Sequence, residues 1–294
     1  MTQPPGKRSP LVIPALIFLL VIGVVEGVIF VYKGKLYSEQ RLQALTFAAD
    51  LRSNAERELN NVLYLTRGLS SYFSVRHDSL EQEEILSILR VAYQTSPLIR
   101  NFGVAVDYQL TYVYPEEGNR AAIGLDYREL ESQWPDVRRA VEQRRPILSE
   151  GVKLLQGGEA FVYRDPIYID DAYWGLLSTV IDAEPLLEAM FAVMEGDSRH
   201  RFSVRANRRE QQPVYLWGDS TLFSQDETVR LTSGRDWEFV VQTRTGDTHW
   251  LPVFILRIFG WVLALVAALG TYSAVLHRRQ RMSRGAPGPT SAFE

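Results

Sequence analysis

The stretch AFVYRDPIYIDDAYWGLLSTVI, residues 160–181, contains two runs rich in β-branched and aromatic residues. Asp170, Asp171 and Ala172 separate the two runs, and aspartate is common in tight turns. Two such runs around a short polar turn predict a β-hairpin, with strands at 160–169 and 173–181. An antiparallel sheet is therefore expected within the folded part of the chain.

The pattern of apolar residues predicts further helices and strands on both sides of the hairpin. Before the hairpin it predicts helices at 36–75, 80–94 and 135–144, and strands at 101–106, 110–114 and 151–155. After the hairpin it predicts a helix at 185–194 and strands at 201–206, 213–217, 228–231 and 237–244. The layout predicts an α+β fold, in which a long stalk helix precedes two small sheet units.

The stalk helix carries an apolar stripe with steps of three and four residues, broken at Arg52. The members of the stripe are Leu45, Ala48, Ala55, Leu59, Val62, Thr66, Leu69 and Phe73. The stripe either packs on its own domain or pairs with a second copy, which would give a homodimer through the stalk helix. The sequence leaves both interpretations open.

Two long apolar blocks, 11–32 and 251–276, flank the predicted domain. Each is long enough to cross about 30 Å of hydrocarbon as a helix. A cleaved signal peptide is the alternative for the first block. However, that block exceeds the roughly 7–15 apolar residues of a signal peptide, and no small-x-small cleavage site follows it. We therefore expect two transmembrane helices, with the stalk helix continuing the first one outward.

Basic residues predict the orientation of these two helices. Lys7 and Arg8 precede the first block and Lys33 and Lys35 follow it, so this block alone gives almost no preference. The second block is directly followed by Arg278, Arg279, Arg281 and Arg284. Both termini are then cytoplasmic, and residues 33–250 lie in the periplasm or outside the cell, held by a bacterial inner membrane.

The composition of the outer segment excludes several classes of function. Residues 33–250 contain 25 basic and 33 acidic residues, a net charge of −8, which argues against nucleic acid or anionic lipid as a partner of the outer domain. The chain has no cysteine, and none of His77, His200, His249 and His277 has metal-ligand spacing to another. Common hydrolase motifs are also absent, so we expect no enzyme, cofactor or metal. A pair of glycosidase carboxylates is a spatial arrangement that the sequence leaves open.

These features divide the chain into consecutive segments. The last segment, 277–294, begins with basic residues and is then rich in Gly, Pro and Ser, so it is expected to be disordered. The expected segments are a cytoplasmic tail (1–10), a transmembrane helix (11–32), stalk helices (33–95), a membrane-distal sheet subdomain (96–182), a membrane-proximal sheet subdomain (183–250), a second transmembrane helix (251–276) and a disordered cytoplasmic tail (277–294).

Several stretches between Ile99 and Ile181 resemble the CHASE family of extracytoplasmic sensor domains, in its bacterial form. The order and spacing of these stretches carry the resemblance, and no single motif does. They are NFGVAVDYQLTYVYPEEGN (101–119), GLDYRE (124–129), PILSEGVKLLQGGEAFVYRDPIY (146–168) and YWGLLSTVID (173–182).

The resemblance implies a long helix followed by two PAS-like sheets, with a ligand pocket in the membrane-distal sheet. It also implies a sensor that binds a small molecule and transmits a signal across the membrane. Family members usually continue into a kinase or a cyclic-nucleotide enzyme, which is absent here. Either a separate signalling protein reads the membrane helices, or the chain is the sensor fragment of a truncated histidine kinase or diguanylate cyclase. A ligand-free membrane scaffold is a third interpretation.

The resemblance also implies positions for the ligand site. Asp126 resembles the acidic residue that anchors an adenine-like ligand in the plant cytokinin receptors of the family, and Leu148 resembles a pocket-wall position. Arg164 stands where those receptors carry a small hydroxyl side chain. This difference argues against a cytokinin and favours an anionic ligand, because a guanidinium needs an anionic or acceptor partner.

The residues themselves allow other roles for these positions. Asp126 also fits a turn or a helix N-cap. Strand alternation places Arg164 on the same face as Val162, so Arg164 either binds a ligand or forms an internal salt bridge. The resemblance implies that Asp126 is one candidate partner, because both positions map to the same pocket in the family. Tyr112 and Tyr114 either line the pocket or belong to the core.

Glu26 and Arg257 are charged residues inside the two apolar blocks, six residues from the outer end of each. Charged residues in such helices tend to face protein and to pair. We therefore predict a Glu26–Arg257 ion pair that couples the two helices. The alternative is that both side chains extend to the outer membrane surface.

Overall fold

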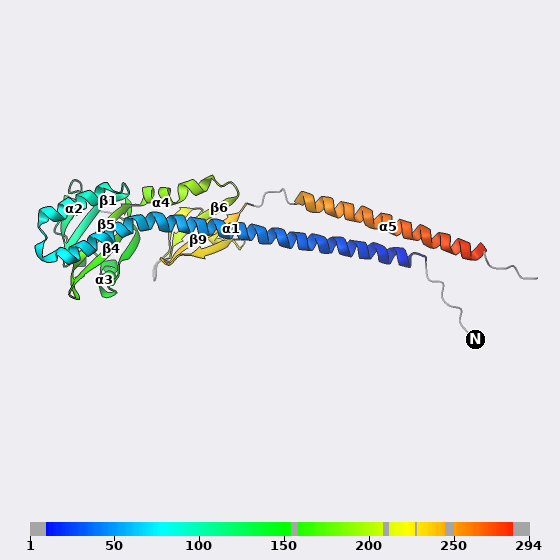
Figure 1. Cartoon of the computed structure of the whole chain (residues 1–294), viewed down its shortest axis with the longest axis horizontal. Helices are drawn as coiled ribbons and strands as arrows, with labels where there is room; N and C mark the ends of the chain where they lie inside the picture. The colour runs from blue at the N-terminus through cyan, green and yellow to red at the C-terminus, as the bar shows by residue number, and fades with distance from the viewer. Residues whose placement is uncertain (1–9, 154–157, 208–211, 227, 245–249, 285–294) are drawn as a thin grey trace, which may run out of the picture. The chain divides into compact units, whose positions relative to one another are not determined.

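The computed structural model describes residues 10–153, 158–207, 212–226, 228–244 and 250–284 (Figure 1). The chain divides into two compact units. The larger is Gln43–Arg244, and the smaller combines residues up to Leu42 with those from Thr245 onward. Helix α1 (Val12–Arg76) contributes residues to both units.

The larger unit contains a five-stranded antiparallel sheet, which we call the first sheet. Its strand order is β2-β1-β5-β4-β3. The strands are β1 (Ile99–Val106), β2 (Gln109–Tyr114), β3 (Ile147–Lys153), β4 (Glu159–Ile169) and β5 (Ala172–Asp182). The predicted hairpin is confirmed as β4 and β5. Asp170 and Asp171, in the turn between them, have φ angles of 45° and 67°, which aspartate tolerates better than most residues.

A second antiparallel sheet has four strands in the order β7-β6-β9-β8. These are β6 (His200–Ala206), β7 (Val214–Gly218), β8 (Val229–Thr232) and β9 (Trp237–Thr243). Helices α2 (Gln82–Gln94) and α3 (Trp134–Glu142) accompany the first sheet, and α4 (Ala183–Phe191) leads from it toward the second. The predicted α+β fold with two antiparallel sheets is therefore confirmed.

The apolar stripe of α1 packs on its own domain. Its members from Ala48 to Phe73 are buried in one core that also contains residues of both sheets, such as Phe102 of β1 and Phe239 of β9. Leu45 is the exception and is 39% exposed. The interpretation in which the stripe packs on its own domain is therefore confirmed from Ala48 to Phe73, and a homodimer through the stalk helix would need another face of α1.

One buried contact joins the two sheets. The indole Nε1 of Trp237, on β9, donates a hydrogen bond of 2.9 Å to Oε1 of Glu150, on β3. The Trp237 ring also lies 6.0 Å from the ring of Phe161, on β4. An unpaired buried indole N–H is costly, so this bond favours one relative placement of the two sheets.

The smaller unit contains the first part of α1 and helix α5 (Trp250–Arg284). Both helices are long and apolar enough to cross a membrane. They pack closely: a Cβ at Gly260 would lie 2.5 Å from a methyl group of Val25. Ile29 and Ala264 are also buried here. Small residues such as glycine permit such close approach between two helices.

The predicted disordered tail is wrong for residues 277–284, because α5 continues to Arg284. Apolar residues alone suggested an end near 276, but an α-helix also tolerates the basic residues that follow. Residues 285–294, the rest of this predicted tail, lie outside the described part of the chain, as do residues 1–9 of the first predicted tail.

Two glycine substitutions test the packing of the larger unit. A Cβ at Gly175 would collide with the backbone carbonyl of Ala105, whereas a Cβ at Gly68, on exposed α1 surface, meets nothing within 4 Å. Gly175→Ala should lower the free energy of unfolding by roughly 2–4 kcal/mol. Gly68→Ala should raise it by roughly 0.5–1 kcal/mol. Urea denaturation of the full chain in detergent micelles measures both changes, and equal stability of the two variants would contradict this packing.

Candidate functional site

A cavity of about 70 Å³ lies on the face of the first sheet that points away from α1. Its other wall is the segment between β2 and α3, which contains the short helices η2 (Arg120–Ala122) and η3 (Tyr127–Glu129). The residues that line it are Asn101, Gly103, Leu110, Ala122, Leu125, Tyr127, Leu130, Gln133, Val162, Ser178 and Val180. The cavity is mainly apolar, with a few polar groups at its wall.

Two local features shape this cavity. A Cβ at Gly103 would lie 2.9 Å from Cδ1 of Leu110, so glycine is the residue that leaves this space open. Across the cavity wall, the hydroxyl groups of Tyr127 and Ser178 lie 2.9 Å apart and share a hydrogen bond. This bond ties η3 to the central strand of the sheet.

Arg164 lies beside the cavity and is completely buried. Its Nη1 donates to Oγ of Ser149 at 2.8 Å, and its Nη2 donates to Oε1 of Gln133, a cavity-lining residue, at 2.7 Å. Its Nε has no hydrogen-bond partner among the described residues. Burial lowers the pKa of Arg164 from its ordinary value, but a guanidinium stays charged in proteins. The charge is therefore held by neutral oxygens.

Arg164 is linked to a carboxylate, that of Asp136, through the hydroxyl group of Ser149. Ser149 also hydrogen-bonds the carboxylate of Asp136, on α3. Asp136 in turn accepts a hydrogen bond of 2.8 Å from Nη2 of Arg139. Because Asp136 already has its own cationic partner, it does not fully neutralise the charge of Arg164.

Asp126 is the N-cap residue of η3, and its carboxylate is bound by Arg128. Its Oδ1 accepts hydrogen bonds from the backbone N–H of Arg128 at 2.8 Å and from Nε of the same residue at 2.9 Å. These bonds hold the pKa of Asp126 below its ordinary value. The contacts of Asp126 are therefore those of an N-cap, and its candidate role as the internal partner of Arg164 is wrong. Leu125 and Tyr127, its neighbours, line the cavity instead.

The other predicted pocket residues lie on the opposite side of the first sheet. Tyr112, Tyr114 and Leu148 pack against the core that contains α1. The ring of Tyr114 lies 5.6 Å from that of Tyr93, on α2. The prediction that these three residues line the same pocket as Arg164 is therefore not supported by their placement.

Sequence reasoning missed the polar groups of the site, which are Asn101, Tyr127, Gln133, Ser149 and Ser178. Ser178 had a usable signal, because it stands beside Thr179 in a largely apolar strand, lies on the same face as Val180 and pairs in register with Arg164. Gln133 stands in an irregular segment, where no periodic pattern shows which way a side chain points. No group of acidic or histidine side chains in the described segments has the arrangement of a metal site.

The smaller unit contains the predicted pair of charged residues. Nε of Arg257 donates to Oε1 of Glu26 at 2.8 Å, and Nη2 donates to Oε2 at 2.7 Å. This two-bond geometry is the strongest that arginine forms with a carboxylate. The structure thus contains the ion pair, and its role in coupling the helices stays a prediction.

Comparisons with solved structures identify domains of the same fold. The sensory domain of the Campylobacter jejuni chemoreceptor Tlp3, solved with isoleucine bound, has a TM-score of 0.52 at 10% identity, and the alignment covers 72% of this chain and 96% of that one. The ligand-binding domain of the Pseudomonas aeruginosa chemoreceptor PctB, in complex with L-arginine, has a TM-score of 0.52 at 11% identity. The alignment covers 74% of this chain and 98% of that one.

An extracellular ligand-binding receptor from Desulfohalobium retbaense also has a TM-score of 0.52, at 12% identity. The alignment covers 68% of this chain and 40% of that receptor, so this chain spans less than half of the receptor's length. At such low identities these likenesses concern the fold. A search of curated protein sequences finds no match.

The family model of the CHASE domain matches residues 36–217. The match runs from α1 to β7 and includes the whole first sheet with its cavity. It also agrees with the resemblance seen in the sequence between Ile99 and Ile181. The chain therefore belongs to the CHASE domain family.

Proposed function

We propose that this protein is a membrane-anchored sensor that binds a small carboxylate-bearing molecule in the cavity of the first sheet. The observation that carries the proposal is the charge of Arg164, which is completely buried beside the cavity and held by neutral oxygens. A buried charge without an ionic partner is costly. A ligand carboxylate would supply the missing charge and displace Gln133 from the guanidinium.

The size of the cavity limits the ligand class. Its volume of about 70 Å³ is well below the roughly 300–1,000 Å³ that is usual for small-molecule sites. We infer a ligand of few heavy atoms, whose entry moves the segment between β2 and α3 outward. The domains of the same fold from C. jejuni and P. aeruginosa were solved with isoleucine and L-arginine. Both ligands are amino acids and carry a carboxylate, which supports this class.

We infer that strand β3 relays binding to the second sheet. Consecutive residues of a strand point to opposite faces. Ser149 contacts Arg164 on the cavity side, while Glu150 accepts the indole hydrogen bond of Trp237 on the other side. A movement of Arg164 toward a ligand therefore acts on Ser149, and through β3 on the contact between the sheets.

The signal would leave the domain through two membrane helices. Both long apolar helices satisfy the requirements of a membrane span. With the expected orientation, residues 33–250 face the periplasm, and the Glu26–Arg257 pair lies between the helices near their outer ends. A change in these helices would be read on the cytoplasmic side of the membrane.

The first test concerns the ligand. Thermal shifts of the full chain in micelles are measured with small L-amino acids, short dicarboxylates and the corresponding amides. We expect a carboxylate to raise the melting temperature while its amide does not. Arg164→Met should lower the affinity for that carboxylate at least about tenfold. Asp126→Asn is the control, because Asp126 pairs with Arg128 and does not line the cavity. Equal binding to wild type and Arg164→Met would refute the site.

The second test concerns the relay through β3. Hydrogen exchange of β9 is compared with and without the ligand identified above. Glu150→Ala removes the acceptor of Trp237, so the ligand-induced change in β9 should be lost. The affinity for the ligand should stay within about threefold of the wild-type value. Glu150→Gln keeps an acceptor and should retain most of the change. An unchanged response of β9 in Glu150→Ala would show that the signal takes another route.

The third test concerns the charged pair. The chain has no cysteine, so a V25C/G260C pair, placed where the helices touch, reports helix contact by cross-linking in membranes. Glu26→Gln and Arg257→Leu should each slow cross-linking, because each leaves one charge unpaired. In the double variant, the rate of cross-linking should fall by less than the sum of the two single effects. Additive effects, or none, would show that the pair does not couple the helices.

A further inference from the structure

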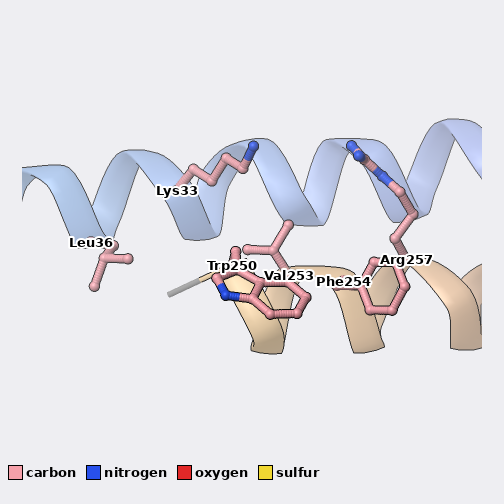
Figure 2. A pocket seen from close by; sticks show the side chains of 6 residues that line it. All are labelled: Lys33, Leu36, Trp250, Val253, Phe254 and Arg257. Carbon is pink, nitrogen blue, oxygen red and sulfur yellow. The ribbon is translucent and has the colours of Figure 1, made fainter. Parts of the chain in front are cut away.

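A groove of about 410 Å³ lies between the two helices of the smaller unit (Figure 2). Figure 2 shows Lys33 extending along α1 toward Arg257, while the side chains of α5 form the opposite wall. The residues that line the groove are Lys33 and Leu36 of α1, and Trp250, Val253, Phe254 and Arg257 of α5. Apolar and aromatic groups therefore form most of its wall, and both polar groups are cations.

The charges of the groove do not balance. Arg257 is neutralised by Glu26. Lys33 forms no hydrogen bond or ion pair with any residue that the structure describes. The local group of Glu26, Lys33 and Arg257 thus carries a net charge of about +1. One monovalent anion would balance it.

The two cations also have free donors. Arg257 uses Nε and Nη2 for Glu26, so the N–H groups of Nη1 make no hydrogen bond to described residues. The Lys33 ammonium offers three further N–H donors. Tetrahedral oxyanions accept several such bonds at once, which matches this arrangement.

The position of the groove along the chain identifies the source of the anion. Lys33 directly follows the apolar block 11–32, and Trp250 directly precedes the block 251–276. In the proposed membrane-spanning state, this is the level of the lipid headgroups, where Trp is enriched and Lys extends toward phosphates. The Trp250 and Phe254 side chains are 60% and 51% exposed, so they offer an apolar surface to an acyl chain.

We propose that this groove is a binding site for an anionic phospholipid of the outer leaflet. The phosphodiester accepts hydrogen bonds from Lys33 and from Nη1 of Arg257, and one acyl chain lies against Phe254. The lipid then fills the space beside the Glu26–Arg257 pair and holds the two helices at this spacing. This inference rests on the proposed membrane insertion and is independent of the ligand of the first sheet.

Native mass spectrometry of the full chain, released from micelles with equal amounts of phosphatidylglycerol and phosphatidylcholine, tests the site. We expect the wild type to retain one phosphatidylglycerol in preference to phosphatidylcholine. Lys33→Gln should weaken that retention about tenfold, as for the loss of one charge-assisted hydrogen bond, and Lys33→Arg should preserve it. Inorganic phosphate at millimolar concentration should not displace the lipid, because it lacks the acyl chain.

Lys35→Gln is the matched control. It removes the same charge two residues away, but the Lys35 side chain is 75% exposed, pairs with Glu39 at 3.7 Å and does not line the groove. Equal loss in both glutamine variants, no preference for phosphatidylglycerol, or displacement by inorganic phosphate would overturn the site. Flotation with vesicles is measured in parallel: a wild-type chain that does not insert overturns the membrane proposal as well, whereas normal insertion without lipid preference overturns this site alone.

Discussion

The packing of the α1 stripe against both sheets is the contact on which the rest of the larger unit depends. One row of side chains, from Ala48 to Phe73, lies in a core shared by the first and second sheets. Within it, the hydroxyls of Thr66 and Thr179 lie 2.7 Å apart in a buried position, so they align α1 with β5. Because the interior is close-packed, α1 cannot slide along the sheets without losing these contacts. The two sheets are therefore held by a common helix and by the Trp237–Glu150 bond.

Most of this architecture could be predicted from the sequence, because long amphipathic and β-rich stretches determine their own element type. The main error in the first sheet concerned β3, which was expected at 151–155 and begins at Ile147. Gly151 has a φ of 60°, and the pairing of β3 with β4 shifts between Ser149 and Val152. This irregularity breaks the alternation on which strand prediction relies. Residues 154 and 155 of the predicted strand lie outside the described part of the chain.

The candidate site was predictable only where it depends on local geometry. Alternation along β4 correctly placed Arg164 on the face of Val162, which lines the cavity. The partners of Arg164 were not predictable, because Ser149 and Gln133 are neutral and come from other parts of the chain. Asp126 was misassigned for a related reason. Its carboxylate bonds a residue two positions away, and such short-range capping competes with any long-range role.

The incomplete neutralisation of Arg164 would link the proposed ligand to the amount of the protein in a cell. A domain with a costly buried charge is less stable when empty than when a carboxylate neutralises that charge. Small differences in stability change how often a protein unfolds and how fast proteases remove it. Supply of the ligand would thus set the lifetime of the sensor as well as its signalling state. A cell that has long been without the ligand would carry fewer copies.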